Sequence, residues 1–288
     1  MIGVAASLLA VATPAIVAQA GPHPLVGGPV VRRTFAYGAD ARQTIDLFTR
    51  DAAGRAPLLV YLHGGGWSAG TPRAGSGGAQ PAHWTARGYA YATVGYRLVP
   101  NVTVEDQLRD VARAVTLLRG QAKVDPERVV LIGHSSGGHL AALLGAGPVW
   151  LGRHFGALRG VVLLDPAALD IAPFMAAGGS VVDRYHRPAF GTEPARWSDL
   201  SPVKHMAAPN APAWAILYDV NNVVSGMQGT DLAAGLIAAG AKAEVTSIAD
   251  TTHLRLNDEI GRPGDRATTV VDAFLAELFP DRQRARFR

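Results

Sequence analysis

The sequence predicts an α/β protein built on a mostly parallel sheet with helices on both faces. Short, continuous apolar runs of the kind that form buried parallel strands occur at residues 58–62, 129–132 and 160–164. Helical patterns separate them, and residues 104–121 give the clearest one because their apolar side chains fall on one face. Strands that alternate with helices are typical of a parallel sheet covered on both sides.

Length and composition fit a single globular domain. The chain has 288 residues, of which 48% are hydrophobic and 17% charged, and this balance excludes a disordered chain. The net charge of +4 is small and scattered, apart from arginines at positions 282, 284, 286 and 288. We therefore expect no nucleic-acid partner. The absence of cysteine excludes disulfides and thiolate metal ligands.

Residues 1–20 have the pattern of a signal peptide. They carry no charged side chain, residues 2–18 are mostly apolar, and Ala18-Gln19-Ala20 has the small-x-small order of a cleavage site. The alternative is a buried or membrane-anchoring helix, which Pro14 and the short length disfavour. We expect an exported bacterial protein, periplasmic or extracellular, whose mature chain starts near Gly21 and has no stable membrane span.

The remaining elements complete one domain over residues 21–288. Residues 30–37 and 44–48 alternate apolar and polar side chains, as expected for two antiparallel opening strands. Residues 165–210 break the strand–helix alternation with six prolines and several aromatic side chains, which predicts an inserted cap. We expect further strands at 89–94, 213–218 and 243–248, and helices at 81–87, 228–239 and 267–278.

Residues 129–144, VVLIGHSSGGHLAALL, read as a strand, a sharp turn and a helix. This is the pattern of the nucleophile elbow of the α/β-hydrolase fold, in which the central Ser135 stands in a strained turn above the sheet. Gly133 and Gly137 fit because a Cβ at either place would collide with the strand or the helix. The backbone N–H of Ser136, at the helix start, favours an oxyanion beside the nucleophile.

A second stretch, Gly66-Trp67-Ser68-Ala69-Gly70, also matches the G-x-S-x-G pattern. With 33 glycines in the chain, chance matches are expected. Ser68 lies several residues past the end of its strand, and Gly70-Thr71-Pro72 follows where a helix would be needed. We therefore assign Ser68 to a loop and Ser135 to the nucleophile.

The motif His63-Gly64-Gly65-Gly66-Trp67 directly follows the strand at residues 58–62. Glycines at this place let the backbone approach a substrate closely, and in the α/β-hydrolase fold such a loop supplies the second half of the oxyanion hole. The alternative, a flexible turn, is disfavoured by the elbow downstream. We expect the N–H groups of Gly65, Gly66 and Ser136 to form the oxyanion hole, with His63 in a structural role.

Four motifs together resemble a known family. The chain is similar to bacterial α/β-hydrolase esterases of the hormone-sensitive-lipase and feruloyl-esterase-like group, including the kynurenine-formamidase-like branch. The similarity covers most of residues 55–280 and implies a carboxylic-ester hydrolase with a Ser–Asp–His triad, a small-molecule ester substrate, no cofactor and no metal. The matching pieces are HGGGW at 63–67, Gly95-Tyr96-Arg97-Leu98, GHSSGGHL at 133–140 and the late His253.

The base of the predicted triad is His253. The chain order in this fold is nucleophile, acid, then His. Several histidines follow Ser135, but only His253 lies after the last predicted strand and before the closing helix, where the fold places its base. The alternative is an exposed loop histidine.

The acid departs from the family pattern. The resemblance implies an Asp about three residues past the penultimate strand, and counting from Tyr218 places Asn221 there. Asp219 lies two residues earlier, and Asp165 follows the preceding strand. We rank Asp219 first, Asn221 second and Asp165 third. An Asn orients an imidazole but cannot stabilise the imidazolium by charge, and in serine proteases the Asp-to-Asn change lowers turnover by about 10⁴.

These residues predict a serine esterase that acts through an acyl-enzyme on short or mid-length acyl, aryl or acetylated-sugar esters. Two alternatives stay open: an arylformamidase-type amidase, and a ligand-binding protein of the same fold whose catalysis is weakened because Asn221 replaces the acid. We expect Trp67 and the cap residues Phe174 and Tyr185 to line the substrate pocket. The alternative for the cap aromatics is that they only pack the cap against the body.

Overall fold

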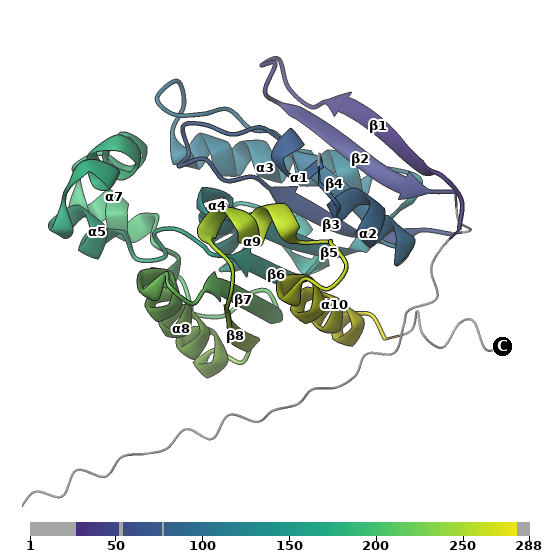
Figure 1. Cartoon of the computed structure of the whole chain (residues 1–288). Coiled ribbons are helices and arrows are strands. Elements are labelled where there is room, and N and C mark those ends of the chain that lie inside the picture. The colour runs from purple at the N-terminus through teal and green to yellow at the C-terminus, as the bar shows by residue number, and fades with distance from the viewer. Residues whose placement is uncertain (1–26, 52–53, 77, 281–288) are drawn as a thin grey trace, which may run out of the picture.

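The computed structural model describes residues 27–51, 54–76 and 78–280. The predicted signal peptide and the C-terminal arginines lie outside these residues. One eight-stranded sheet runs through the molecule in the order β1-β2-β4-β3-β5-β6-β7-β8 (Figure 1). Its strands are β1 (Val30–Ala36), β2 (Thr44–Arg50), β3 (Ala56–Leu62), β4 (Ala90–Val94), β5 (Val124–His134), β6 (Leu158–Leu164), β7 (Ala213–Asp219) and β8 (Lys242–Ile248).

The sheet has the mostly parallel pairing that the sequence predicts. β1 and β2 pair antiparallel, β2 runs antiparallel to β4, and every pairing from β4 through β8 is parallel. Parallel strands end at the same edge of a sheet, so the loops after β3, β5, β6, β7 and β8 meet there. This topology fits the α/β-hydrolase fold that the sequence predicts.

Helices cover both faces of the sheet, and successive strand residues point to opposite faces. The principal helices are α2 (Gln80–Ala86), α3 (Val104–Arg119), α4 (Ser136–Gly145), α8 (Val223–Ala238), α9 (His253–Glu259) and α10 (Arg266–Leu278). On β3, Leu58, Val60 and Leu62 join the core under α3, α4 and α8, whereas Leu59 and Tyr61 join the core under α2 and α10.

The cap predicted at residues 165–210 consists of short helices between β6 and β7, on the opposite side of the molecule from β1 and β2 (Figure 1). Arg196 ties it to the body, because its guanidinium donates to both carboxylate oxygens of Glu105 on α3, at 2.9 and 2.8 Å. The cap elements are α5 (Ile171–Ala177), η2 (Val182–His186), α6 (Arg187–Phe190), α7 (Pro194–Asp199) and η3 (Pro202–Lys204).

Two helices differ from the sequence prediction, and both differences affect the site. α8 begins at Val223 rather than at Gln228, because the side chain of Asn222 accepts from the N–H of Ser225 and caps the helix. His253 does not lie in a loop: it is the first residue of α9, a seven-residue helix capped by Thr252. α1 (Arg73–Ser76) and η1 (Gly152–Ala157) are minor additions.

Over the described part of the chain, no helix combines the length and apolar character needed to cross a bilayer.

Candidate active site

Ser135 stands at the junction of β5 and α4 with the strained backbone that the elbow pattern predicts. Its φ of +54° and ψ of −121° lie outside the regions that side chains ordinarily allow. A Cβ on Gly133 would collide with the carbonyl of Gly137, and a Cβ on Gly137 would collide with the carbonyls of Leu62 and His63. The two glycines are therefore required for β5, α4 and the end of β3 to approach this closely.

One cavity of about 730 Å³ connects the predicted site residues. Ser135, His253 and Asp165 all line it, and the glycine loop at 64–66 forms another part of its wall. Ser68 is not among its lining residues and lies in a turn. Ser68 therefore does not line the cavity, although its neighbours Gly66, Trp67 and Ala69 do.

His253 contacts Asp165, the third-ranked acid candidate. Nδ1 of His253 and Oδ2 of Asp165 are 2.6 Å apart, and the Asp165 side chain is fully buried. The expectation that Asp219 stands beside His253 is wrong in geometry: Oδ1 of Asp219 instead accepts from the backbone N–H of Asn221 at 3.0 Å and from its Nδ2 at 3.1 Å. Asn221 itself is exposed and contacts Asp219 rather than the histidine.

The strand order explains why Asp165 reaches the site. β6 lies between β5 and β7, with Leu164 opposite His134 on one side and Leu217 on the other. Asp165 is the next residue, with φ of +46°, and its N–H donates to the carbonyl of Leu217 at 2.7 Å. It therefore emerges one strand nearer to Ser135 than a residue following β7 would.

His134, the residue before the nucleophile, holds the backbone of His253. Its Nε2 lies 2.8 Å from the carbonyl oxygen of His253. Burial lowers the pKa of His134 to about 4, so the ring is neutral near pH 7, and a neutral ring donates through Nε2–H to that carbonyl. The elbow and His253, the predicted base, are thus joined directly, although they lie more than a hundred residues apart in the chain.

Two of the three predicted oxyanion donors, Gly65 and Gly66, line the same cavity, and Ser136 directly follows Ser135. Gly65 and Gly66 adopt φ of +127° and +59°, and a Cβ on Gly66 would collide with the ring of Tyr185. Among the described contacts, the N–H groups of both glycines have no hydrogen-bond acceptor. Ser136 is the first residue of α4, where a helix leaves its N–H without an intrahelical partner. Free N–H groups on two sides of Ser135 are suited to hold an oxyanion.

The motif Gly95-Tyr96-Arg97-Leu98 braces the start of the glycine loop. The hydroxyl of Tyr96 donates to the carbonyl of His63 at 2.6 Å, and the two rings stack at 4.3 Å. Burial lowers the pKa of His63 to about 4, so this histidine is a neutral support inside the wall and not a base that faces Ser135.

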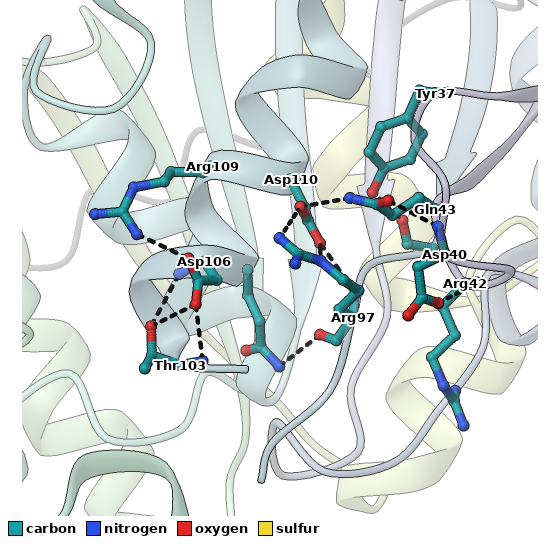
Figure 2. A network of polar contacts seen from close by, with 11 residues as sticks. Tyr37, Asp40, Arg42, Gln43, Arg97, Thr103, Asp106, Arg109 and Asp110 are labelled. Atoms are coloured by element: carbon teal, nitrogen blue, oxygen red, sulfur yellow. Dashed lines mark hydrogen bonds and ion pairs between the residues drawn. The ribbon is translucent and has the colours of Figure 1, made fainter. Parts of the chain in front are cut away.

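Helix α3 supports the glycine loop through a network of polar contacts, part of which is shown in Figure 2. Arg97 donates to both carboxylate oxygens of buried Asp110, at 2.8 and 2.7 Å, and Gln43 donates to Asp110 at 2.8 Å. One turn earlier on α3, Nε2 of Gln107 donates to the carbonyls of Trp67 at 2.7 Å and Arg97 at 2.9 Å. These contacts fix the end of the glycine loop relative to the helix.

Trp67, Phe174 and Tyr185 line the cavity, as expected for the substrate walls. Sequence reasoning missed the other side of the mouth, where Val224 and Leu254 are both largely exposed at the starts of α8 and α9. Two polar side chains of α9, Asn257 and Asp258, also line this side. Their signal in the sequence is weak because α9 has only seven residues. Among the described residues, no group of three His, Asp or Glu side chains is placed to hold a metal ion.

Comparisons with known proteins agree with this arrangement. A family model described as BD-FAE matches residues 45–148, a range that includes the glycine loop and the elbow. The chain is 30% identical over 118 residues, 40% of this chain and 24% of the relative, to the probable isoprenylcysteine alpha-carbonyl methylesterase ICMEL1 of Arabidopsis thaliana. It is 32% identical over 121 residues, 39% of this chain and 27% of the relative, to the probable carboxylic ester hydrolase LipM of Mycobacterium tuberculosis.

The chain thus spans about a quarter of the length of these relatives. Among solved structures, the inhibited esterase B from Lactobacillus rhamnosis superposes with a TM-score of 0.72 at 20% identity. That match covers 91% of this chain and 92% of the other. The likeness shows an α/β-hydrolase fold over nearly the whole chain.

Proposed function

We propose that the protein is a serine carboxylic-ester hydrolase, with Ser135 as nucleophile, His253 as base and Asp165 as acid. The observation that carries the proposal is the 2.6 Å contact between His253 and the buried Asp165, at the cavity in which Ser135 stands on a strained elbow. The names of the curated relatives, a methylesterase and a carboxylic ester hydrolase, support the same reaction.

The contact geometry supports the following proton transfers. Because Nδ1 of His253 faces Asp165, Nε2 is the atom that takes the proton of Ser135 as its oxygen attacks the ester carbonyl. Asp165 stabilises the imidazolium that forms, and the N–H groups of Gly65, Gly66 and Ser136 hold the oxyanion. Collapse of the tetrahedral intermediate breaks the C–O bond, and the alcohol leaves with the proton. Water then releases the acid from the acyl-enzyme by the same steps.

The alternative of a weakened, ligand-binding protein rested on Asn221 in the acid position. A carboxylate, Asp165, faces His253, so that reason no longer applies. No particular contact in the cavity favours the arylformamidase alternative. Activity on formylated aromatic amines compared with esters of the same aryl group separates the two reactions.

The polar side chains of the cavity favour a neutral ester with an apolar chain. Both the nitrogen and the oxygen of Asn222, Gln228 and Asn257 are engaged in hydrogen bonds within the protein, and the hydroxyl of Ser225 donates to Pro166. This leaves chiefly Tyr185, His186 and Asp258 to bind the hydroxyls of a sugar, and a hydroxyl buried without a partner weakens binding. Among the esters considered above, an acyl chain therefore suits the cavity better than an acetylated sugar.

The test is covalent labelling by a fluorophosphonate, combined with hydrolysis of p-nitrophenyl butyrate. The unmodified protein is expected to be labelled and active, and Ser135→Ala is expected to lose both properties. Ser68→Ala is the matched control, because it removes the serine of the competing motif outside the cavity, and it should retain both. Labelling that survives Ser135→Ala, or is lost in Ser68→Ala, contradicts the assignment.

Export remains our proposal from the first 20 residues. N-terminal sequencing of the protein from its native host is expected to start near Gly21, and a soluble cytoplasmic chain that retains Met1 would contradict it.

A further inference from the structure

Asn222 is the second side chain in contact with Asp165. Its Nδ2 lies 3.0 Å from Oδ1 and 3.1 Å from Oδ2 of the carboxylate. Its own oxygen accepts from the N–H of Ser225 at 3.3 Å and caps α8. If the carboxamide were turned over, its oxygen would face a carboxylate and its nitrogen would face an N–H group. The helix cap therefore fixes which end of Asn222 meets Asp165.

Asp165 is a buried carboxylate with few partners. Within the described part of the chain, its only ion-pair partner is His253, and its hydrogen bonds come from His253 and Asn222. When His253 is neutral, before the proton transfer, no cation faces this negative charge. A buried carboxylate needs hydrogen-bond donors, because burying a charged group without them is costly. Asn222 supplies two of the three donor contacts to Asp165, so the orientation of this carboxylate depends on it.

The loop that carries Asn222 is itself held in place. The carbonyl of Asp219 accepts from the N–H of Asn222 at 2.7 Å, while its carboxylate binds the N–H and the carboxamide of Asn221. Asp219 therefore closes the turn between β7 and α8 as an Asx turn does. This turn places Asn222 against Asp165 and accounts for the near-complete burial of Asp219 away from His253.

We propose that Asn222 is a positioning residue, which holds the carboxylate of Asp165 aimed at Nδ1 of His253. Asn222 acts on the nucleophile only through those two residues, and the inference rests on the proposed hydrolase function. The titratable groups around Asp165 are His253 on α9 and His134 at the end of β5. Burial lowers the pKa of His134 to about 4, so it adds no charge near neutral pH.

Two substitutions separate this role from the capping of α8. Asn222→Ser and Asn222→Asp both keep an oxygen that can cap the helix, but neither side chain donates from a carboxamide. For Asn222→Ser we expect kcat on p-nitrophenyl butyrate to fall about ten- to a hundredfold with little change in KM. For Asn222→Asp the acidic limb of the pH profile of kcat/KM should also move to higher pH, because a second carboxylate stabilises the protonated His253.

Asn221→Ser is the matched control, since Asn221 is the exposed neighbour and does not contact Asp165. It should keep the wild-type kcat and pH profile. A wild-type kcat in Asn222→Ser would overturn the proposal. The proposal would also be overturned if both Asn222 variants lose kcat in proportion to a lowered melting temperature and the pH profile of Asn222→Asp is the same as that of the wild type. A wild-type protein without labelling or ester hydrolysis would overturn the hydrolase function itself, and this inference with it.

Discussion

Replacing Asp165 by Asn tests which carboxylate serves as the acid. The substitution keeps the shape of the side chain but removes a negative charge 2.6 Å from the ring of His253. At a separation of ~4 Å between charge centres and an effective dielectric constant of ~20, that charge stabilises the imidazolium by about 4 kcal/mol. This is about three powers of ten in rate. The Asp-to-Asn change in serine proteases costs about 10⁴.

The hydrogen bonds around position 165 add to this loss. Both neighbours, Nδ1 of His253 and Nδ2 of Asn222, present hydrogens to the carboxylate. A carboxamide at position 165 accepts from one neighbour and opposes the other with its own NH₂ group. His253 relieves this donor–donor repulsion by adopting the other tautomer. That tautomer carries its proton on Nε2, so Nε2 cannot accept a proton from Ser135. We therefore expect kcat of Asp165→Asn to fall by about 10³ to 10⁴.

The assay is kcat for p-nitrophenyl butyrate, measured on Asp165→Asn and on Asp219→Asn as the matched change. Asp219→Asn should retain at least about a third of wild-type turnover, because an Asn oxygen can still accept from the N–H of Asn221 and close the turn. Circular dichroism and thermal unfolding establish that both variants are folded. If Asp219→Asn loses more activity than Asp165→Asn, or if Asp165→Asn stays within tenfold of wild type, the assignment of the acid is refuted.

Three further outcomes are expected. Leu254 lies at the exposed rim of the cavity. Leu254→Ser should lower several-fold the ratio of kcat/KM for p-nitrophenyl hexanoate to kcat/KM for p-nitrophenyl acetate, because each buried methylene contributes roughly 0.8 kcal/mol. An unchanged ratio would contradict an apolar rim. Gln107→Leu should lower thermal stability by about 1–3 kcal/mol and reduce kcat, since the carbonyl of Arg97 loses its side-chain donor and that of Trp67 keeps only the N–H of Val99. Stability should also fall from pH 6.5 to pH 4, by up to about 4 kcal/mol per pH unit, because His63, His134 and His139 have folded pKa values of about 4 and take up protons only on unfolding. Denaturant unfolding at both pH values checks this, and a flat profile would contradict it.

The strained turn at Ser135 and the glycine loop could be predicted from the sequence because local backbone geometry determines them. Ser135 needs glycines two residues before and after it, and the steric reason is the same in the structure as in the pattern. The loop at Gly65 and Gly66 likewise requires positive φ angles, which only glycine adopts without strain. Signals of this kind lie within a few residues and do not depend on the order of the strands.

The contact between Asp165 and His253 could not be predicted from the sequence because it depends on tertiary structure. Counting along the chain from Tyr218 identifies Asn221, but the turn that Asp219 closes points Asn221 toward solvent and Asn222 inward. Asp165 follows a strand whose place in the sheet, between β5 and β7, is not encoded near it in the sequence. α9 was missed for a related reason, since seven residues are too few for a helical period to stand out.

The contacts of His253 explain how the acid can follow β6 instead of β7. Asp165 orients the imidazole of His253 through Nδ1, and the backbone carbonyl of His253 accepts from His134. These two contacts fix both the ring and its backbone relative to β5 and β6, the adjacent strands that carry Ser135 and Asp165. The strand β7 then contributes a donor, Asn222, in place of a charge. A carboxylate at either strand end could meet the ring, provided that the other strand end supplies neutral donors, because two adjacent carboxylates repel each other.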